Sequence, residues 1–536
     1  MDRQRNQYIH KISSSLNAGN IPLAETLALD ALRIYKREYV FISLLGLVKT
    51  RQAKWPEAIK LFQKAAKLEP KNWEALRNLA NAYKAAGDAN AAHQHLIRAL
   101  MINPNAADLR VSMAQILVQK SEYAKALNQL EMALRLRPDY PEAYFMLLEI
   151  CERTNDLEQL RKAISTNESV TRVHPVTRLF KGILAARDGD EKEAASILEQ
   201  VDFSKYNPDV VVTYQRMKNS ALAMLNDKAG NVDTAFAQFT KAKQFNRALP
   251  QNAGADAGEF HRQIARRQAY FSGQGPKARA DMKTDEQAPV FFVGFPRSGT
   301  TLLDTFLRGH PDVQVQEEKP ATKEMIAALE ASGANGIDAP GVHDRSVLKK
   351  ARRAYFSAMP GVETGGVMVD KAPFNLVYAG EILRVFPDAK FVFSLRDPAD
   401  VVLSCFMQTF KLSHSMAALE SPLEAAKTYD LALGLWRSIE NSLSPRVCYL
   451  KYEDLVSDPE TTLRGVVNFM NLPWNSAVLR HTETAKAREH IGTPSYTQVV
   501  KPLYSSSVSR WKKYAGLMPE ALEVIQPWRK HFGYSD

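Results

Sequence analysis

The sequence has few cysteines and no long apolar run, and both absences limit what the protein can be. Its 536 residues include only Cys151, Cys405 and Cys448, which lie far apart and form no Cys-x-x-Cys pair. This spacing indicates neither a disulfide scaffold nor a zinc site, and it fits a reducing compartment. The first residues lack the apolar core of a signal peptide, and the longest apolar stretch, 40–48, is about half of a membrane span. We therefore expect a soluble, cytoplasmic protein.

The sequence also lacks the arginine-rich arms and zinc-finger spacings of many nucleic-acid-binding proteins, so nucleic acid is disfavoured as a partner. Its hydrophobic content of 45% and charged content of 24% are typical of a globular chain. The formal net charge of +11 fits either an ordinary basic surface or attraction for an anionic ligand. A chain of this length predicts two or more domains.

A 34-residue period runs through the first half of the chain. Alanine recurs at this interval in two series and proline in a third: Ala24, Ala58, Ala92 and Ala126; Ala31, Ala65, Ala99 and Ala133; Pro70, Pro104 and Pro138. The period predicts pairs of helices, with a small residue where the helices cross and a proline that ends the second helix. This half resembles tetratricopeptide repeats, with regular repeats over roughly 5–171 and degenerate ones around 182–198 and 235–242.

The resemblance implies an all-α solenoid whose concave groove holds a protein or an extended peptide. The candidate groove residues Asn78, Asn81, Lys84 and Arg110 are equally typical of an ordinary polar surface. We expect the repeat domain to span 1–248. The repeat register fails over 249–287, which predicts a linker with one helix near 259–270.

The remaining part, 288–536, changes to alternating strand and helix patterns. Short β-branched and aromatic runs at 288–295, 390–395 and 446–452 predict buried parallel strands. Helical segments such as 380–386 and 519–528 lie between and after them. This alternation predicts an α/β domain with a parallel sheet that is covered by helices on both faces.

The first predicted strand leads into GFPRSGTT (294–301), which has the skeleton of a phosphate-binding loop (P-loop). Gly294 and Gly299 allow the backbone to curl around an anion, and Thr300 and Thr301 begin a helix with a positive dipole end. A nucleoside triphosphatase has lysine where Thr300 stands, whereas here the cation is Arg297, inside the loop. A metal-bound triphosphate is therefore a poor fit, and a phosphate ester that carries another small oxyanion fits better.

The segment FVGFPRSGTTLL (292–303) resembles the 5′-phosphosulfate loop of sulfotransferases, and its PRSGTT form is similar to that of protein-tyrosine sulfotransferases. The likeness extends over most of 289–536. It implies an α/β fold that uses 3′-phosphoadenosine 5′-phosphosulfate (PAPS) without a metal. It also implies which residues hold the 5′-phosphosulfate: Arg297, Ser298, Gly299, Thr300 and Thr301.

A second anion site is predicted at the end of the strand 390–395, where Arg396 is followed eight residues later by Ser404. Ligands bind at such strand ends in parallel sheets, and a guanidinium beside a hydroxyl suits a phosphate. The resemblance makes this the 3′-phosphate of PAPS; the alternative is an arginine that caps a helix or pairs with Asp397. The resemblance adds further cofactor contacts: Tyr452, Ser495, Lys501, Tyr504 and Arg510. The chain departs from the family at Arg510, where the family has lysine, and at Gln408, where it has arginine.

The candidate catalytic residues are Lys371, Glu318 and the loop cation Arg297. A lone lysine in DKAPFN (370–375) is usually solvated, but the resemblance implies that Lys371 contacts the bridging oxygen as its bond to sulfur breaks. An acidic pair before a helix is also common as a polar turn. The resemblance implies that Glu318 is the general base for the acceptor hydroxyl, with Glu317 as the alternative.

Together these residues predict a PAPS-dependent sulfotransferase that transfers a sulfonyl group to a hydroxyl, and the family suggests a protein tyrosine. A glycan or a small molecule stays open as the acceptor. Two other functions also stay open: a repeat-based scaffold with an inactive nucleotide-binding fold, and a magnesium-dependent nucleotide kinase or triphosphatase. The repeats would recruit the acceptor or a partner protein.

Overall fold

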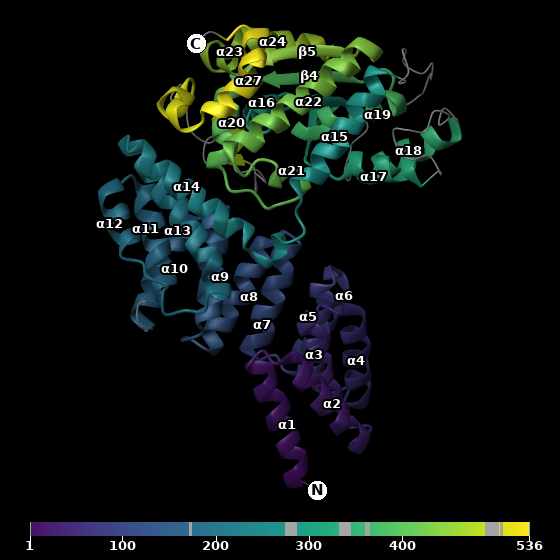
Figure 1. Ribbon diagram of the computed structural model, residues 1–536, viewed down its shortest axis with the longest axis vertical. Helices are drawn as coiled ribbons and strands as arrows, with labels where there is room; N and C mark the ends of the chain where they lie inside the picture. Colours follow the sequence, from purple (N-terminus) through teal and green to yellow (C-terminus); the bar gives the residue numbers. More distant parts are fainter. Residues whose placement is uncertain are drawn as a thin grey trace. The chain divides into compact units, whose positions relative to one another are not determined.

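The computed structural model describes residues 2–170, 174–273, 287–331, 345–359, 365–487, 503 and 507–534 (Figure 1). By its contacts the chain divides into two compact units, Met1–Asp202 and Phe203–Asp536. The described part of the first unit is helical, and the sheet lies in the second. None of the described helices is both long and apolar enough to cross a bilayer.

The first unit is a series of helix pairs, which confirms the prediction from the 34-residue period. Successive helices pack against each other as antiparallel neighbours. Their bounds are α1 (Asp2–Asn17), α2 (Ile21–Ile34), α3 (Tyr39–Arg51), α4 (Trp55–Leu68), α5 (Trp73–Ala85), α6 (Ala89–Ile102), α7 (Ala107–Gln119), α8 (Tyr123–Leu136), α9 (Pro141–Thr154), α10 (Leu157–Val170), α11 (Pro175–Asp188) and α12 (Glu191–Glu199).

The periodic residues lie where the repeat geometry needs them. Every alanine of the two series is 0% exposed, and α4, α6 and α8 each end two residues before the periodic proline. A Cβ added to Gly46 of α3 would lie 2.7 Å from the Phe62 ring, and one added to Gly182 of α11 would lie 2.7 Å from Leu198 Cγ. The degenerate pair α11–α12 therefore keeps the close helix crossing of the regular repeats.

The last helix pair of the repeat pattern, α13 (Pro208–Ala229) and α14 (Val232–Arg247), groups with the second unit. The division by contacts thus falls after Asp202, whereas we expected the boundary at 248. The reason is packing, because the Phe236 and Phe239 rings of α14 lie 4.7 and 6.0 Å from the ring of Phe406.

The region expected to be a linker contains α15 (Ala257–Ser272), which is part of the core of the second unit. Its apolar side chains Phe260, Ile264 and Phe271 are buried. Helix α15 packs along α22 (Pro422–Leu443), so this segment is structural and does not merely connect two domains. Residues 274–286 of the expected linker lie outside the described residues.

The second unit contains a five-stranded parallel sheet in the order β2-β3-β1-β4-β5. Its strands are β1 (Val290–Gly294), β2 (Val313–Glu317), β3 (Val367–Lys371), β4 (Lys390–Leu395) and β5 (Arg446–Lys451). The parallel sheet and the strands β1, β4 and β5 confirm the prediction. Sequence reasoning missed β2 and β3, because VQVQE and VMVDK alternate or end in polar residues and lack a continuous apolar run.

Helices cover both faces of this sheet. Phe291, Phe391 and Phe393 point into one core, and Phe292 and Val392 point into the other, because successive strand residues face opposite ways. Figure 1 shows α22 beside β4. The covering helices are α16 (Thr300–Leu307), α17 (Ala321–Glu330), α18 (Arg345–Ser357), α19 (Ala379–Val385), α20 (Pro398–Met407), α22, α23 (Tyr452–Ser457), α24 (Pro459–Phe469), α25 (His481–Ala487) and α27 (Pro519–His531).

Candidate active site

Each of the five strands brings candidate residues to its carboxyl end. Along the sheet order these are Glu317 on β2, Lys371 on β3, the loop 294–299 after β1, Arg396 after β4 and Tyr452 after β5. Neighbouring strands lie about 4.8 Å apart, so three strand spacings separate the glutamate from the arginine by about 14 Å. The sheet therefore divides the site into a glutamate side and a guanidinium side, with the loop between them.

The loop after β1 is curled by residues with positive φ: Gly294 (151°), Arg297 (72°) and Gly299 (99°). A positive φ is unusual for a residue with a side chain, and such strained positions cluster at functional sites. The Ser394 hydroxyl of β4 donates to the Ser298 carbonyl oxygen over 2.7 Å. This bond directs the Ser298 carbonyl toward the sheet.

Close contacts explain why both ends of the loop are glycine. A Cβ on Gly294 would lie 2.6 Å from the Ser394 carbonyl oxygen, and one on Gly299 would lie 2.6 Å from Cδ2 of Tyr452. Gly299 is also the N-cap of α16. The first turn of a helix offers N–H groups without intrahelical acceptors and a positive dipole end, so this arrangement suits an anion.

Arg297 links the loop to the residues that follow β4. Its Nε donates to Ser404 Oγ of α20 over 3.1 Å, and its carbonyl oxygen accepts from Arg396 Nη1 over 3.2 Å. Arg396 and Ser404, which we expected as a couple, are thus joined through Arg297. Asp397, the alternative partner of Arg396, instead accepts from Arg529 Nε over 3.1 Å.

The guanidinium of Arg396 is oriented from two further directions. Its Nη2 donates to the Ser507 carbonyl oxygen over 2.5 Å, and its Cζ lies 4.9 Å from the centre of the Tyr452 ring. The Tyr452 hydroxyl lies 3.0 Å from Ser507 Oγ. Arg396 is only 8% exposed, so the loop, the end of β5 and the C-terminal segment hold it in place before any ligand binds.

Two buried polar atoms on this side have no hydrogen-bond partner among the residues that the structure describes: Ser298 Oγ and Arg396 Nε. Leaving such an atom unpaired costs about 1–3 kcal/mol, so it calls for an explanation such as a ligand. Both atoms can donate to an anionic oxygen. A ligand with anionic groups at two positions therefore fits these residues.

On the other side, Lys371 joins the two glutamates. Its Nζ donates to Glu317 Oε1 over 2.9 Å and to Glu318 Oε1 over 3.1 Å. Burial alone would lower the pKa of Lys371, but the carboxylates of Glu318, Glu317 and Asp304 outweigh burial and raise it. The lysine therefore stays charged and offsets part of the negative charge of the two glutamates.

The two glutamates differ in access to solvent. The Glu318 side chain is 51% exposed, whereas that of Glu317 is 13% exposed. Glu318 has a φ of 47°, and its N–H donates to the Lys371 carbonyl oxygen over 2.9 Å. An acceptor arriving from solvent can therefore reach Glu318 more easily than Glu317.

Family models match both halves of the chain. Residues 289–476 match the sulfotransferase family, and 50–116 and 84–151 match the tetratricopeptide repeat. The chain joins tetratricopeptide repeats to a sulfotransferase-family domain. This confirms the two resemblances found in the sequence. The matched part of the sulfotransferase domain contains the loop, both glutamates, Lys371, Arg396 and Tyr452.

Three similar proteins give the extent of the likeness. Protein-tyrosine sulfotransferase 1 of Danio rerio is 29% identical over 266 residues, which cover 47% of this chain and 73% of that protein. An uncharacterized protein of Aquifex aeolicus is 24% identical over 427 residues, which cover 77% of this chain but only 54% of that protein. A solved tetratricopeptide repeat protein from Parabacteroides merdae is 18% identical with a TM-score of 0.37, covering 45% of this chain and 93% of that one.

Four further cofactor residues were predicted in the sulfotransferase domain: Ser495, Lys501, Tyr504 and Arg510. Ser495, Lys501 and Tyr504 lie outside the described residues. Arg510 is described, and its guanidinium forms an ion pair with Asp227 of α13. Within the described ranges, no group of three or more His, Cys, Asp or Glu side chains is arranged to hold a metal ion.

Sequence reasoning missed supporting residues of the sulfotransferase domain, among them Ser394, Asp400 and Ser507. Ser394 had a signal, because it is a polar residue near the end of the apolar strand KFVFSL. Asp400 accepts from the N–H groups of Ser509 and Trp511 over 2.7 and 2.9 Å, and burial raises its pKa. The only sequence signal for Asp400 was its position as an acidic residue in the first turn of a helix. No sequence pattern pointed to Ser507.

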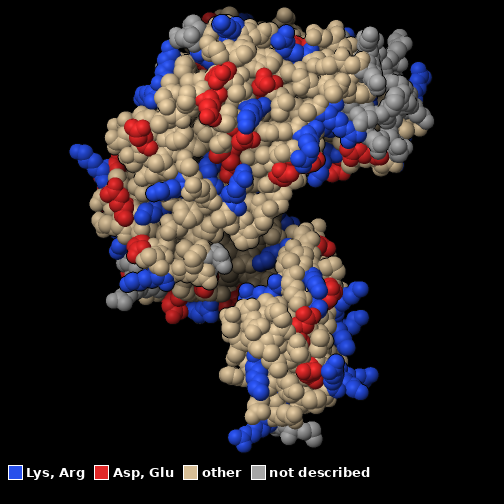
Figure 2. All heavy atoms as spheres, in the orientation of Figure 1, with Lys and Arg blue, Asp and Glu red and all other residues tan. Residues whose placement is uncertain are grey.

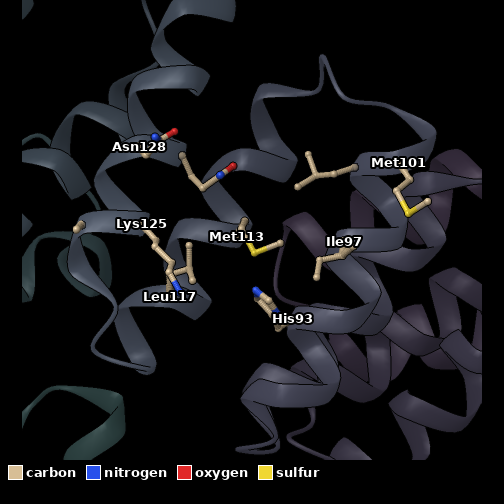
Figure 3. A pocket seen from close by; sticks show the side chains of 10 residues that line it. His93, Ile97, Met101, Met113, Leu117, Lys125 and Asn128 are labelled. Atoms are coloured by element: carbon tan, nitrogen blue, oxygen red, sulfur yellow. The ribbon is translucent and has the colours of Figure 1, made fainter.

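The repeat unit has a pocket of its own, with a volume of about 690 Å³, between α6, α7 and α8. Figure 3 shows His93, Ile97 and Met113 directed into the space between α6 and α7. Two of the candidate groove residues bond to neighbouring helices: Lys84 donates to Gln115, and Arg110 donates to Gln129, which is part of the lining. The pocket lining is mainly apolar, and its polar residues include His93 and Lys125.

Proposed function

We propose that this protein is a PAPS-dependent sulfotransferase whose acceptor is a hydroxyl of a protein or peptide. The observation that carries the proposal is a pair of buried donors, Ser298 Oγ and Arg396 Nε, that have no partner among the described residues and lie beside the loop curled by Gly294 and Gly299. A nucleotide with anionic groups at both its 5′ and 3′ positions satisfies both donors. The sulfotransferase match over 289–476 favours PAPS as that nucleotide.

On the guanidinium side, the loop binds the 5′-phosphosulfate through the N–H groups that begin α16 and through side chains of the loop. These residues are Arg297, Ser298, Gly299, Thr300 and Thr301. Arg396 and Ser404 bind the 3′-phosphate, and Arg297 connects the two anion sites through its bonds to both residues. The Tyr452 ring supports Arg396 and encloses Gly299. Ser495, Lys501 and Tyr504 stay predictions.

On the glutamate side, PAPS supplies a sulfonyl group whose leaving group is the 5′-phosphate. Glu318 accepts the proton of the acceptor hydroxyl while the hydroxyl oxygen forms a bond to sulfur. The bond between sulfur and the bridging oxygen breaks, and its electron pair stays on the phosphate oxygen. Lys371 stabilises this new negative charge, and Glu317, at 2.9 Å, orients the lysine.

Within this proposal, we take the acceptor to be a tyrosine in an acidic segment. Lys319, directly after Glu318, and Lys323, in the first turn of α17, are exposed. The exposed Arg345, Lys349 and Arg353 follow one face of α18 at a spacing of four residues. Figure 2 shows basic and acidic side chains interspersed over the visible face, so local basic residues are a better guide to the acceptor than the net charge. The repeats would recruit the acceptor protein or a partner.

Two measurements with the full chain test the proposal. With radiolabelled PAPS and an acidic peptide that contains one tyrosine, we expect label on the peptide and none on its phenylalanine counterpart. In a thermal-shift assay, adenosine 3′,5′-bisphosphate should raise Tm, because it binds only the folded state. Stabilisation by ATP–magnesium alone would favour a nucleotide kinase or triphosphatase. Binding of the bisphosphate without transfer to proteins, glycans or small hydroxyl compounds would favour a scaffold.

A further inference from the structure

Asp227 of α13 lies outside the 289–476 sulfotransferase match, yet it binds the segment that holds Arg396. Its Oδ1 accepts from the Tyr514 hydroxyl over 2.7 Å and from Arg510 Nε over 3.3 Å. Arg510 Nη2 also donates to Oδ2. Both partners lie in the 3₁₀ helix η5 (Arg510–Leu517). The Asp227 side chain is 10% exposed, so this ion pair is largely shielded from water.

Asp400 holds the same segment from the other side. Its two oxygens accept from the N–H groups of Ser509 and Trp511 at the start of η5. Ser509 has a φ of 59°, a conformation that costs energy unless neighbouring groups maintain it. The start of η5 is therefore clamped between a carboxylate on α13 and one on α20.

From this clamp the chain leads directly to the nucleotide side of the site. Ser507 lies two residues before Ser509, and its carbonyl oxygen accepts from Arg396 Nη2. The Ser507 hydroxyl is hydrogen-bonded to the Tyr452 hydroxyl, and the Tyr452 ring lies against the Arg396 guanidinium. The position of Ser507 thus helps to set the direction of Arg396 Nε, which has no partner in the ranges that the structure describes.

The α13–α14 pair is itself fixed to the sulfotransferase domain, so it can serve as a rigid support. Buried Lys243 of α14 donates to the Gln408 carbonyl oxygen over 2.6 Å and to Glu420 Oε1 over 3.1 Å. Asn246 Nδ2 donates to the Phe410 carbonyl oxygen over 2.9 Å. Phe236 and Phe239 pack on Phe406 of α20, the helix that also carries Asp400 and Ser404.

We propose that Asp227 is a positioning residue for the nucleotide site: its carboxylate fixes η5, and η5 orients Arg396 through Ser507. This inference rests on the proposed function, because it requires Arg396 to bind a nucleotide phosphate. The last helix pair, which continues the repeat pattern in the sequence, then acts as part of the cofactor site. Arg510 contributes to cofactor binding indirectly, through Asp227.

The test compares Asp227→Asn with Glu381→Gln in the full chain, using adenosine 3′,5′-bisphosphate as the titrated ligand. Glu381 forms a comparably buried ion pair with Arg267, at 2.9 Å, between α19 and α15. Both variants should lower Tm. When two residues belong to one polar network, changing one typically alters an equilibrium constant that depends on the other severalfold or more. We therefore expect Asp227→Asn to raise Kd for the bisphosphate by about fivefold or more. Glu381→Gln should leave Kd within about twofold, as for distant sites.

Two further measurements separate positioning from a purely structural role. With PAPS as substrate, Asp227→Asn should raise KM and leave kcat largely unchanged, because the acceptor side is not altered. Arg510→Gln, which leaves Asp227 intact, should raise Kd by a similar factor. The Kd of the double variant should not exceed that of the weaker-binding single variant, because both changes break the same ion pair. Arg510→Gln also serves as the primary test if Asp227→Asn does not fold.

The outcomes distinguish the inference from the function on which it rests. If the unaltered protein does not bind the bisphosphate, the proposed function is overturned. If it binds, and Asp227→Asn or its substitute Arg510→Gln shows the same Kd as Glu381→Gln, the inference alone is overturned. A rise in Kd confined to the Asp227 and Arg510 variants supports it.

Discussion

The two sides of the candidate site are built in opposite ways. On the guanidinium side, backbone carbonyls and an aromatic ring orient Arg396, and within the described part of the chain Arg396 Nε and Ser298 Oγ have no hydrogen-bond partner. On the glutamate side, Lys371 is paired with both Glu317 and Glu318. The first side is therefore prepared for a ligand in advance. On the second side, the single positive charge of Lys371 lies between the two glutamates and offsets part of their negative charge.

The largest effect should come from Glu318→Gln, which removes the exposed carboxylate that we propose as the base. General base catalysis contributes about 10²–10⁴-fold, so kcat should fall by that factor while Kd for adenosine 3′,5′-bisphosphate stays the same. Steady-state turnover with labelled PAPS and calorimetric titration measure the two quantities. Glu317→Gln is the matched comparison, with a smaller loss of kcat. A larger loss of kcat in Glu317→Gln than in Glu318→Gln would instead assign the role of base to Glu317.

Arg396→Ala tests the guanidinium side and should show the converse pattern. A hydrogen bond to a charged group contributes about 1.5–3 kcal/mol, so Kd for the bisphosphate should rise about tenfold or more. At saturating PAPS, kcat should change much less, because the glutamate side is intact. Arg464→Ala, in an exposed ion pair on α24, is the control and should leave Kd unchanged. Equal losses of kcat and of affinity in Arg396→Ala would show that the two sides do not have separate roles in nucleotide binding and turnover.

Gly299→Ala tests how strongly the conformation of the loop 294–299 depends on glycine at this position. The added Cβ would lie 2.6 Å from the Tyr452 ring at a φ of 99°, and a residue in such a conformation costs about 1–3 kcal/mol. Denaturant unfolding should show this loss. Gly465→Ala in α24, where a Cβ meets nothing within 4 Å, should instead stabilise the protein by about 0.5–1 kcal/mol. Equal stability of the two variants would argue against a tightly held loop.

The smallest effect concerns Asp370, the residue before Lys371 on β3. Burial raises its pKa to about 6, although bonds from Tyr355 and Asn375 and the charge of Lys371 act in the opposite direction. A carboxyl that binds its proton more tightly in the folded state stabilises the protein at low pH and loses this contribution as pH rises through about 6.

The unaltered protein should therefore lose about 1 kcal/mol of stability, relative to Asp370→Asn, between about pH 5 and about pH 7. Denaturant unfolding of both proteins across this range measures the difference, and Asp388→Asn, at an exposed carboxyl, provides the control. Parallel pH profiles for the unaltered protein and Asp370→Asn would show that Asp370 keeps an ordinary pKa.

Much of the fold was predictable, because local rules generate it. The alanine and proline periods correspond to buried helix crossings and helix ends, and the apolar runs of β1, β4 and β5 correspond to buried strands. The short strands β2 and β3 were not predictable in this way. Their pairing, such as Glu317 beside Lys371, joins residues far apart in the chain, and no local pattern specifies it.

The sequence by itself determined the repeat register, the curled glycine loop and the residue types of the candidate site, because backbone conformation and side-chain chemistry follow from local identity. Only the tertiary structure decided that one lysine holds both glutamates and that Arg297 joins Arg396 to Ser404. It also decided that Asp227 of the last helix pair binds Arg510. These contacts arise when packing brings distant segments together, and the free energy of that packing depends on the whole core.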